Sequence, residues 1–165
     1  MKKELPYCTT GKAIKGYNES VIAKGETNDC VVRAFASCFN LSYDRAHKYV
    51  KEKFGRKDRQ GTYGTVNTMM FLSLKKTQIN YKRIKRMGNR QLGLLNYSLQ
   101  YSVKTKGGLI FRNMTVGTFI KKNPVGTFFI LVKGHAFTIK DGVVIGNYED
   151  AQKPRRVMLD AFEIK

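Results

Sequence analysis

Apolar residues recur at helical spacing shortly after residue 27. They stand at i, i+3, i+4, i+7 and i+8, which is the spacing of one face of an amphipathic helix. The residues just before them, Thr27, Asn28 and Asp29, are all types that favour helix N-caps. The pattern therefore predicts a helix with Cys30 in its first turn, and its apolar face comprises Val31, Ala34, Phe35, Cys38 and Phe39.

Three further segments have a helical pattern. A second helix is expected from Ser42 to Gly55, because a capping residue precedes the apolar series and a glycine follows it. A third is expected from about residue 65 through 74. A short helix is expected to be capped by Thr115 and to end at Asn123-Pro124, since the residue before a proline is disfavoured in a helix.

The last third of the chain alternates between apolar runs and turn residues. The run 127–132 is continuously apolar, as expected of a central strand covered on both faces. Further strands are expected at 135–139, 143–148 and 157–164, with weaker signals at 79–84 and 109–111. The chain is therefore expected to be α+β, with N-terminal helices, the first one carrying Cys30, packed on a C-terminal antiparallel sheet.

An Asp-Gly dipeptide at 141–142 lies between two of these strands and predicts a hairpin with two allowed registers. A two-residue turn pairs Ile139 with Val144. A three-residue loop pairs Ile139 with Val143 and sets His135 opposite Asn147. We favour the three-residue loop, because only this register places large apolar residues opposite one another along the hairpin.

The favoured register brings complementary chemistry together. His135 shares a sheet face with Phe137 and Ile139, and the helix carrying Cys30 is the most apolar element available to cover that face. The dipole and free N–H groups of a helix start stabilise a thiolate there, and an adjacent imidazolium lowers the thiol pKa further. A thiolate, a histidine base and the Asn147 amide that orients the histidine form the arrangement of a cysteine hydrolase.

Three strings carry a more specific resemblance. Asn28-Asp29-Cys30-Val31-Val32-Arg33-Ala34 at a helix start, followed later by Gly134-His135-Ala136-Phe137 and Asp141-Gly142, resembles the papain-like cysteine peptidase superfamily. The similarity is strongest to small phage- and plasmid-borne members and covers roughly residues 27–148 in order. The resemblance implies a single papain-like domain at 27–165, preceded by an N-terminal arm at 1–26.

The resemblance also implies roles for individual residues. Cys30 would be the nucleophile, His135 the general base and acid, and Asn147 the orienting group, with Glu149 or Asp150 in its place if the strand bulges. The implied activity is that of a thiol peptidase or amidohydrolase, acting on peptide or isopeptide bonds of a protein or peptide substrate.

An oxyanion hole would use the Cys30 backbone N–H and one side-chain amide. Papain has a glutamine six residues before its cysteine, where this chain has Lys24. Asn28 is the nearest amide upstream of Cys30 and is the expected second donor.

The charge of the chain adds other possibilities. The 165 residues carry a formal net charge of +19, and no acidic residue lies between Asp58 and Asp141. We expect this basic segment, 59–140, to meet an anionic partner such as nucleic acid, an acidic protein surface or an anionic membrane surface. Two alternative functions therefore stay open: a non-catalytic cationic structural component of a phage virion (capsid-associated or internal), and a nucleic-acid-binding accessory protein. The densest basic patch comprises Lys82, Arg83, Lys85, Arg86 and Arg90.

Composition excludes several classes of protein. Three widely spaced cysteines do not make a disulfide framework, which favours a reducing compartment such as the host cytoplasm or a virion. With two histidines and no Cys-x-x-Cys pair, neither a metal site nor a cofactor is expected. No apolar run approaches the roughly 18 residues of a transmembrane helix. No signal peptide is expected either, because Glu4 and Pro6 follow the basic start of the chain.

Overall fold

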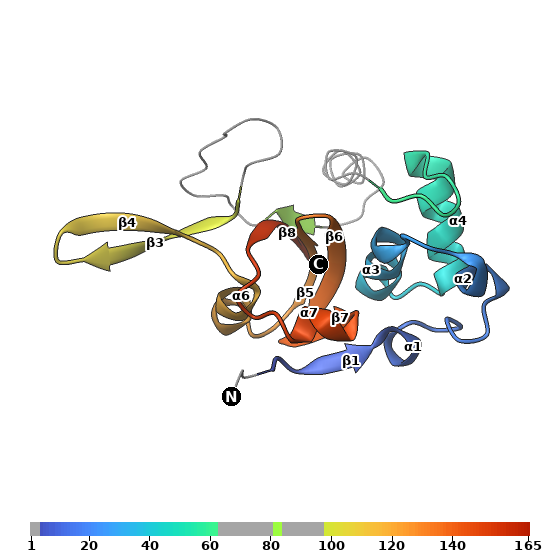
Figure 1. Ribbon diagram of the computed structural model, residues 1–165, viewed down its shortest axis with the longest axis horizontal. Coiled ribbons are helices and arrows are strands. Elements are labelled where there is room, and N and C mark those ends of the chain that lie inside the picture. Colours follow the sequence, from blue (N-terminus) through green and yellow to red (C-terminus); the bar gives the residue numbers. More distant parts are fainter. Residues whose placement is uncertain (1–3, 63–80, 84–97) are drawn as a thin grey trace.

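A six-stranded sheet forms the centre of the protein (Figure 1). The computed structural model describes residues 4–62, 81–83 and 98–165. The strand order is β1-β7-β6-β5-β8-β2, and all neighbouring strands are antiparallel except β1 and β7, which are parallel. The strands are β1 (Tyr7–Thr9), β2 (Tyr81–Arg83), β5 (Thr127–Val132), β6 (His135–Lys140), β7 (Val143–Gly146) and β8 (Met158–Ile164). Helices and sheet together confirm the expected α+β class.

Two helices cover one face of this sheet. Helix α3 spans Cys30–Phe39 and begins at the N-cap Asp29, and α4 spans Tyr43–Phe54 between Ser42 and the left-handed Gly55. Both agree with the elements expected from apolar periodicity and capping residues. Their apolar faces form one core with residues of the sheet, including Phe129, Leu131, Ala136 and Phe162. The helix expected over 65–74 lies outside the described residues.

A second core lies on the opposite face of the sheet. Helix α6 (Val116–Lys122) packs there, capped by the Thr115 side chain as expected. Phe119 of α6 meets Phe128 of β5 edge to face, with ring centroids 5.0 Å apart. Figure 1 shows α3 and α6 on opposite sides of the sheet, so the central strands are covered on both faces.

The register expected for the β6–β7 hairpin is wrong. The turn has two residues, Asp141 and Gly142, both with positive φ (48° and 77°), and Ile139 pairs with Val144. The expected register rested on pairing large apolar residues with one another, which applies when only one face of the hairpin packs against a core. Both faces of β6 are buried, so this pairing criterion does not apply, and the turn preferred by Asp-Gly decides the register.

The face covered by the Cys30 helix also differs from the expectation. Thr138 Oγ1 donates a hydrogen bond to the Ala34 carbonyl of α3 at 3.1 Å, so α3 covers the Ala136–Thr138 face of β6. Phe137 and Ile139 belong to the opposite core with α6. His135 is the first residue of β6 and therefore lies where the strand begins.

The remaining elements lie at the periphery. The segment expected as an arm, 1–26, contributes the edge strand β1, helix α1 (Thr10–Ala13) and helix α2 (Val21–Gly25). Strands β3 (Gln100–Thr105) and β4 (Gly108–Asn113) form a separate hairpin that projects from the body of the molecule (Figure 1). Among the described residues, no helix is long and apolar enough to cross a membrane.

Candidate active site

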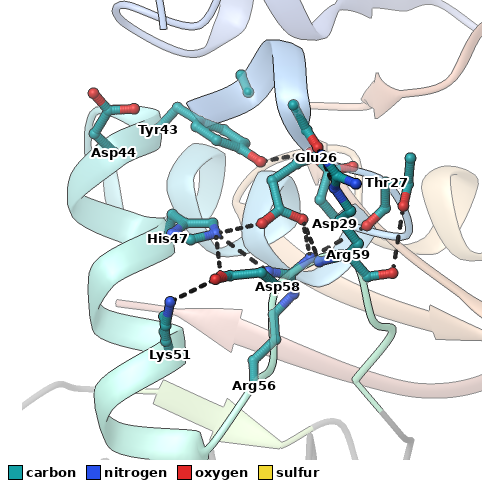
Figure 2. Close-up of polar contacts among 12 residues, drawn as sticks. Glu26, Thr27, Asp29, Tyr43, Asp44, His47, Lys51, Arg56, Asp58 and Arg59 are labelled. Atoms are coloured by element: carbon teal, nitrogen blue, oxygen red, sulfur yellow. Dashed lines mark hydrogen bonds and ion pairs between the residues drawn. The ribbon is translucent and has the colours of Figure 1, made fainter. Parts of the chain in front are cut away.

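The start of helix α3 presents Cys30 in an unusual capping arrangement. Cys30 is the first helical residue, and the Asp29 side chain makes no capping hydrogen bond to the helix. Asp29 Oδ2 instead accepts a hydrogen bond from the Tyr43 hydroxyl at 2.7 Å, a contact drawn in Figure 2. The first N–H groups of a helix have no partner within it, so those beside Cys30 stay available as donors.

Cys30 and His135 influence each other's pKa, although they are far apart in sequence. Burial raises the pKa of the Cys30 thiol, but three residues lower it: His135 through hydrogen bonding and charge, Ala136 through its backbone N–H, and Arg33 through its charge. The lowering effects outweigh burial, and the net pKa lies below the ordinary thiol value. The site therefore raises the fraction of thiolate, the nucleophilic form of cysteine, above that of an ordinary thiol at the same pH.

Asp150 holds the other side of the His135 ring. Its Oδ2 lies 2.9 Å from His135 Nε2, which leaves Nδ1 of the ring for the sulfur. Burial lowers the pKa of His135, but its hydrogen bonding to Asp150 and Cys30 raises it more, to about 9. The imidazolium is therefore favoured at neutral pH.

The Asp150 carboxylate is itself held in place. Only 3 % of its side chain is exposed, and Arg156 Nη1 donates to Oδ1 at 3.1 Å. The Asn147 backbone N–H donates to Oδ2 at 2.8 Å. Asp150 thus has partners on both oxygens, as a buried carboxylate requires.

Asn147 does not occupy the place expected for it. Its side-chain Oδ1 accepts a hydrogen bond from Arg33 Nη1 at 2.8 Å, and His135 is bonded to Asp150 instead. The reason is that β7 ends at Gly146 rather than continuing to residue 148. Asn147 becomes the N-cap of helix α7 (Tyr148–Ala151), and the third residue of that helix, Asp150, turns back toward His135. Glu149 is exposed.

Gly146 makes room for this carboxylate. A Cβ at position 146 would lie 2.7 Å from Asp150 Oδ2 and 2.9 Å from Phe137 Cβ, closer than real contacts allow. The Gly146 carbonyl accepts hydrogen bonds from the Tyr7 and Thr10 hydroxyls, both at 3.1 Å. The N-terminal segment therefore supports the turn that leads into α7.

Arg33 connects the two helix starts of the site. It lies one turn after Cys30, and its Nε is 3.0 Å from Oδ1 of Asp29, the N-cap of α3. Its Nη1 donates to Asn147, the N-cap of α7. Arg33 thus joins the first turn of the helix that carries Cys30 to that of the helix that carries Asp150.

Sequence reasoning did not find Arg33, Arg156 or Gly146. It left Asp150 as an alternative, although the Asn-x-x-Asp spacing at 147–150 is a capping-box signal that could have selected it. No comparable local signal marks Arg33 or Arg156, because their partners lie on other elements of the fold.

The expected second oxyanion donor has a different contact. Asn28 has a left-handed backbone (φ 54°), and its Nδ2 donates to the Arg59 carbonyl at 3.2 Å. This amide therefore ties the loop before α3 to the loop after α4. Its expected role as an oxyanion donor stays a prediction, and the Cys30 backbone N–H is the donor that the capping geometry leaves available.

A second polar cluster lies beside this loop (Figure 2). Glu26, His47 and Asp58 converge closely enough to be considered as metal ligands. However, the fully buried Arg56 side chain lies among them, with Nη2 2.7 Å from Glu26 Oε2 and Nη1 3.3 Å from His47 Nε2. The hydrogen bond from Arg56 lowers the pKa of Glu26 to about 2. A guanidinium already supplies the positive charge, so the cluster does not fit a metal ion and instead anchors the loop that leads to Cys30.

The expected basic patch is described only in part. Lys82 and Arg83 belong to β2, whose backbone pairs with β8 at the sheet edge. Lys85, Arg86 and Arg90 lie outside the described residues. Their expected role in binding an anionic partner stays a prediction.

No protein-family model, curated protein or solved structure matches this chain. The resemblance to papain-like peptidases therefore stays an expectation, and the functional conclusion depends on the geometry of Cys30, His135 and Asp150.

Proposed function

We propose that this protein is a thiol hydrolase of papain-like type that cleaves peptide or isopeptide bonds. One observation carries the proposal. His135 Nε2 lies 2.9 Å from Asp150 Oδ2, and the same imidazole lowers the pKa of the Cys30 thiol. Nucleophile, acid–base group and orienting carboxylate are the three parts that acyl transfer through a thiolate requires.

The first half of the reaction acylates the enzyme. The Cys30 thiolate attacks the carbonyl carbon of the substrate, and the C=O electron pair moves to the oxygen of a tetrahedral intermediate. The Cys30 backbone N–H stabilises that oxyanion. When the intermediate collapses, the C–N bond breaks and the His135 imidazolium gives its proton to the departing amine, which leaves a thioester on Cys30.

The second half releases the acid. Neutral His135 takes a proton from water as the water oxygen attacks the thioester carbonyl. The C–S bond then breaks, the carboxylic acid product leaves, and the thiolate–imidazolium pair is restored. Asp150 orients the ring throughout and stabilises its charged form.

Alkylation of the native protein with iodoacetamide tests the first requirement, a poised thiolate. Mass spectrometry reads each cysteine separately. We expect Cys30 to react at pH values well below about 8.5, where an ordinary thiol is mostly protonated. Cys38 is buried, and burial raises the pKa of its thiol to about 12, so it serves as the unreactive internal control.

Two variants complete the test. His135→Ala should move the reactivity of Cys30 toward that of an ordinary thiol, because it removes the hydrogen bond that favours the thiolate. Cys30→Ser should abolish hydrolysis of peptide substrates while circular dichroism shows an unchanged fold. If Cys30 of the unmodified chain reacts no faster than Cys8, the nucleophile is not activated and the proposed hydrolase function is wrong.

A further inference from the structure

A large open groove lies between the N-terminal segment, α6 and the loop before β8, and Arg156 is one of the residues that line it. Its volume is about 1130 Å³, above the ~300–1,000 Å³ of typical small-molecule sites. Backbone hydrogen bonds hold its walls: Gly117 N–H donates to the Pro154 carbonyl at 2.8 Å and Leu5 N–H to the Ala151 carbonyl at 3.0 Å. The backbone on two sides of the groove is therefore held in place, and the space is larger than most small molecules need.

The groove carries unpaired positive charge. Lys121, Lys153 and Arg155 line it, and none of them forms an ion pair with any acidic residue of the described chain. Of the described residues that line it, Glu4 alone is acidic, and both its carboxylate oxygens accept hydrogen bonds from the Tyr148 hydroxyl. A ligand with carboxylates would supply the charge that the groove lacks.

The rest of the lining suits a peptide better than a nucleic acid. Leu5, Ile120 and Pro154 offer aliphatic surface, and among the described lining residues none is aromatic. Proteins that bind single-stranded nucleic acid commonly stack bases on aromatic rings. A peptide with aliphatic side chains and flanking carboxylates would match both the apolar walls and the cations of the groove.

We propose that this groove binds an extended, acidic segment of a partner polypeptide. The partner's carboxylates pair with Lys153, Arg155 and Lys121, and its aliphatic side chains contact Leu5 and Ile120. The binding does not depend on the chemistry of Cys30, so it can succeed or fail independently of the proposed hydrolase function.

The test measures fluorescence anisotropy at about 0.1 M ionic strength, where the Debye length is about 10 Å, with a short fluorescein-labelled peptide of glutamate and leucine. The protein is the full chain carrying Cys30→Ser, so that no reaction can consume the peptide. In the groove variant, Lys153→Glu is combined with Arg155→Glu. We expect its dissociation constant to rise about tenfold or more, since two attractive charge contacts become repulsive.

A matched control separates the groove from the overall charge. Lys104→Glu combined with Lys106→Glu, on the exposed β3–β4 hairpin, makes the same change in formal charge, from +19 to 19 − 4 = +15. We expect it to weaken binding less than about threefold, because the exposed charges lie far from the ligand and are screened. Equal losses in the two variants would mean that net charge alone attracts the peptide, and the proposal would be wrong.

Two further outcomes overturn the proposal. One is an absence of peptide binding to the unmodified groove. The other is that a short oligothymidylate binds as tightly as the peptide and loses affinity to the same extent in the groove variant, which would assign the groove to nucleic acid. Failure of the hydrolase function would appear separately, in the alkylation of Cys30.

Discussion

Replacing Asp150 by asparagine is the sharpest test of the proposed site. The change removes the negative charge that lies against His135 Nε2 and leaves the size of the side chain almost unchanged. An asparagine oxygen in the place of Oδ2 can still accept the hydrogen bond from the Asn147 N–H, so the turn into α7 should persist, although the bond from Arg156 to Oδ1 is lost. We expect the imidazolium of His135 to lose its main stabilising partner, and the thiolate of Cys30 to become less favoured as a result.

The size of the effect follows from the pKa of His135. Its value of about 9 is about 2.5 units above the ordinary 6.5, which corresponds to about 3 kcal/mol at ~1.36 kcal/mol per unit. The hydrogen bond to Asp150 is the largest of the effects that raise it. We therefore expect the asparagine variant to lower this pKa by about one to two units, on the order of 2 kcal/mol. The pKa of Cys30 should rise toward its ordinary value of 9.0.

Two measurements read these shifts without a substrate. NMR titration of the imidazole follows His135, with His47→Gln used to assign the two histidines. The pH dependence of iodoacetamide alkylation follows Cys30. Glu149→Gln is the matched control: it removes one carboxylate from the same short helix, at an exposed position, and should leave both titrations almost unchanged. Should Asp150→Asn leave both titrations where they are in a protein that remains folded, Asp150 does not govern the pair.

Two other substitutions test the surroundings of the site. Gly146→Ala should displace the Asp150 carboxylate and lower the alkylation rate of Cys30 at neutral pH. It should also lower the free energy of unfolding in urea by about 1–3 kcal/mol. The control is Gly61→Ala, where an added Cβ meets nothing within 4 Å, and it should change neither the alkylation rate nor the stability. Glu26→Gln leaves Arg56 buried without its carboxylate and should lower the free energy of unfolding at neutral pH by about 3 kcal/mol or more. Because the pKa of Glu26 falls from 4.5 to about 2 on folding, its stabilisation is complete above pH 4.5 and is lost as the pH falls through 2. The difference in stability between the two proteins, measured by denaturant unfolding, should therefore shrink over that range; a difference that stays constant would mean that the charge of Glu26 contributes nothing.

Local sequence patterns predicted much of the fold. The start of α3 and both ends of α4 and α6 were expected from apolar periodicity and from residue types typical of helix ends, such as Gly55 and Thr115, because these signals join residues a few positions apart. The position of Cys30 in the first turn of α3 follows from the same rules. The continuous apolar run of β5 also predicted correctly that both faces of this strand are covered.

The register of the β6–β7 hairpin could not be derived in this way. The side-chain pattern alone does not tell which elements cover each face of a strand. In the folded protein α3 covers one face of β6 and α6 shares a core with the other, so the expected pairing of large residues does not occur. The turn preference of Asp141-Gly142 was the better local signal, because it depends only on the backbone of two residues.

Sequence alone thus pointed to two members of the proposed site, Cys30 and His135, because each stands at the start of a helix or strand that local rules define. Tertiary structure decided which groups hold them. Asp150 replaces Asn147 because the chain turns into α7 after Gly146, while Arg33 and Arg156 reach their partners only once separate elements have packed. A hydrogen bond between side chains depends on distances of a few ångströms between distant parts of the chain, and only the packing of the helices on the sheet sets those distances.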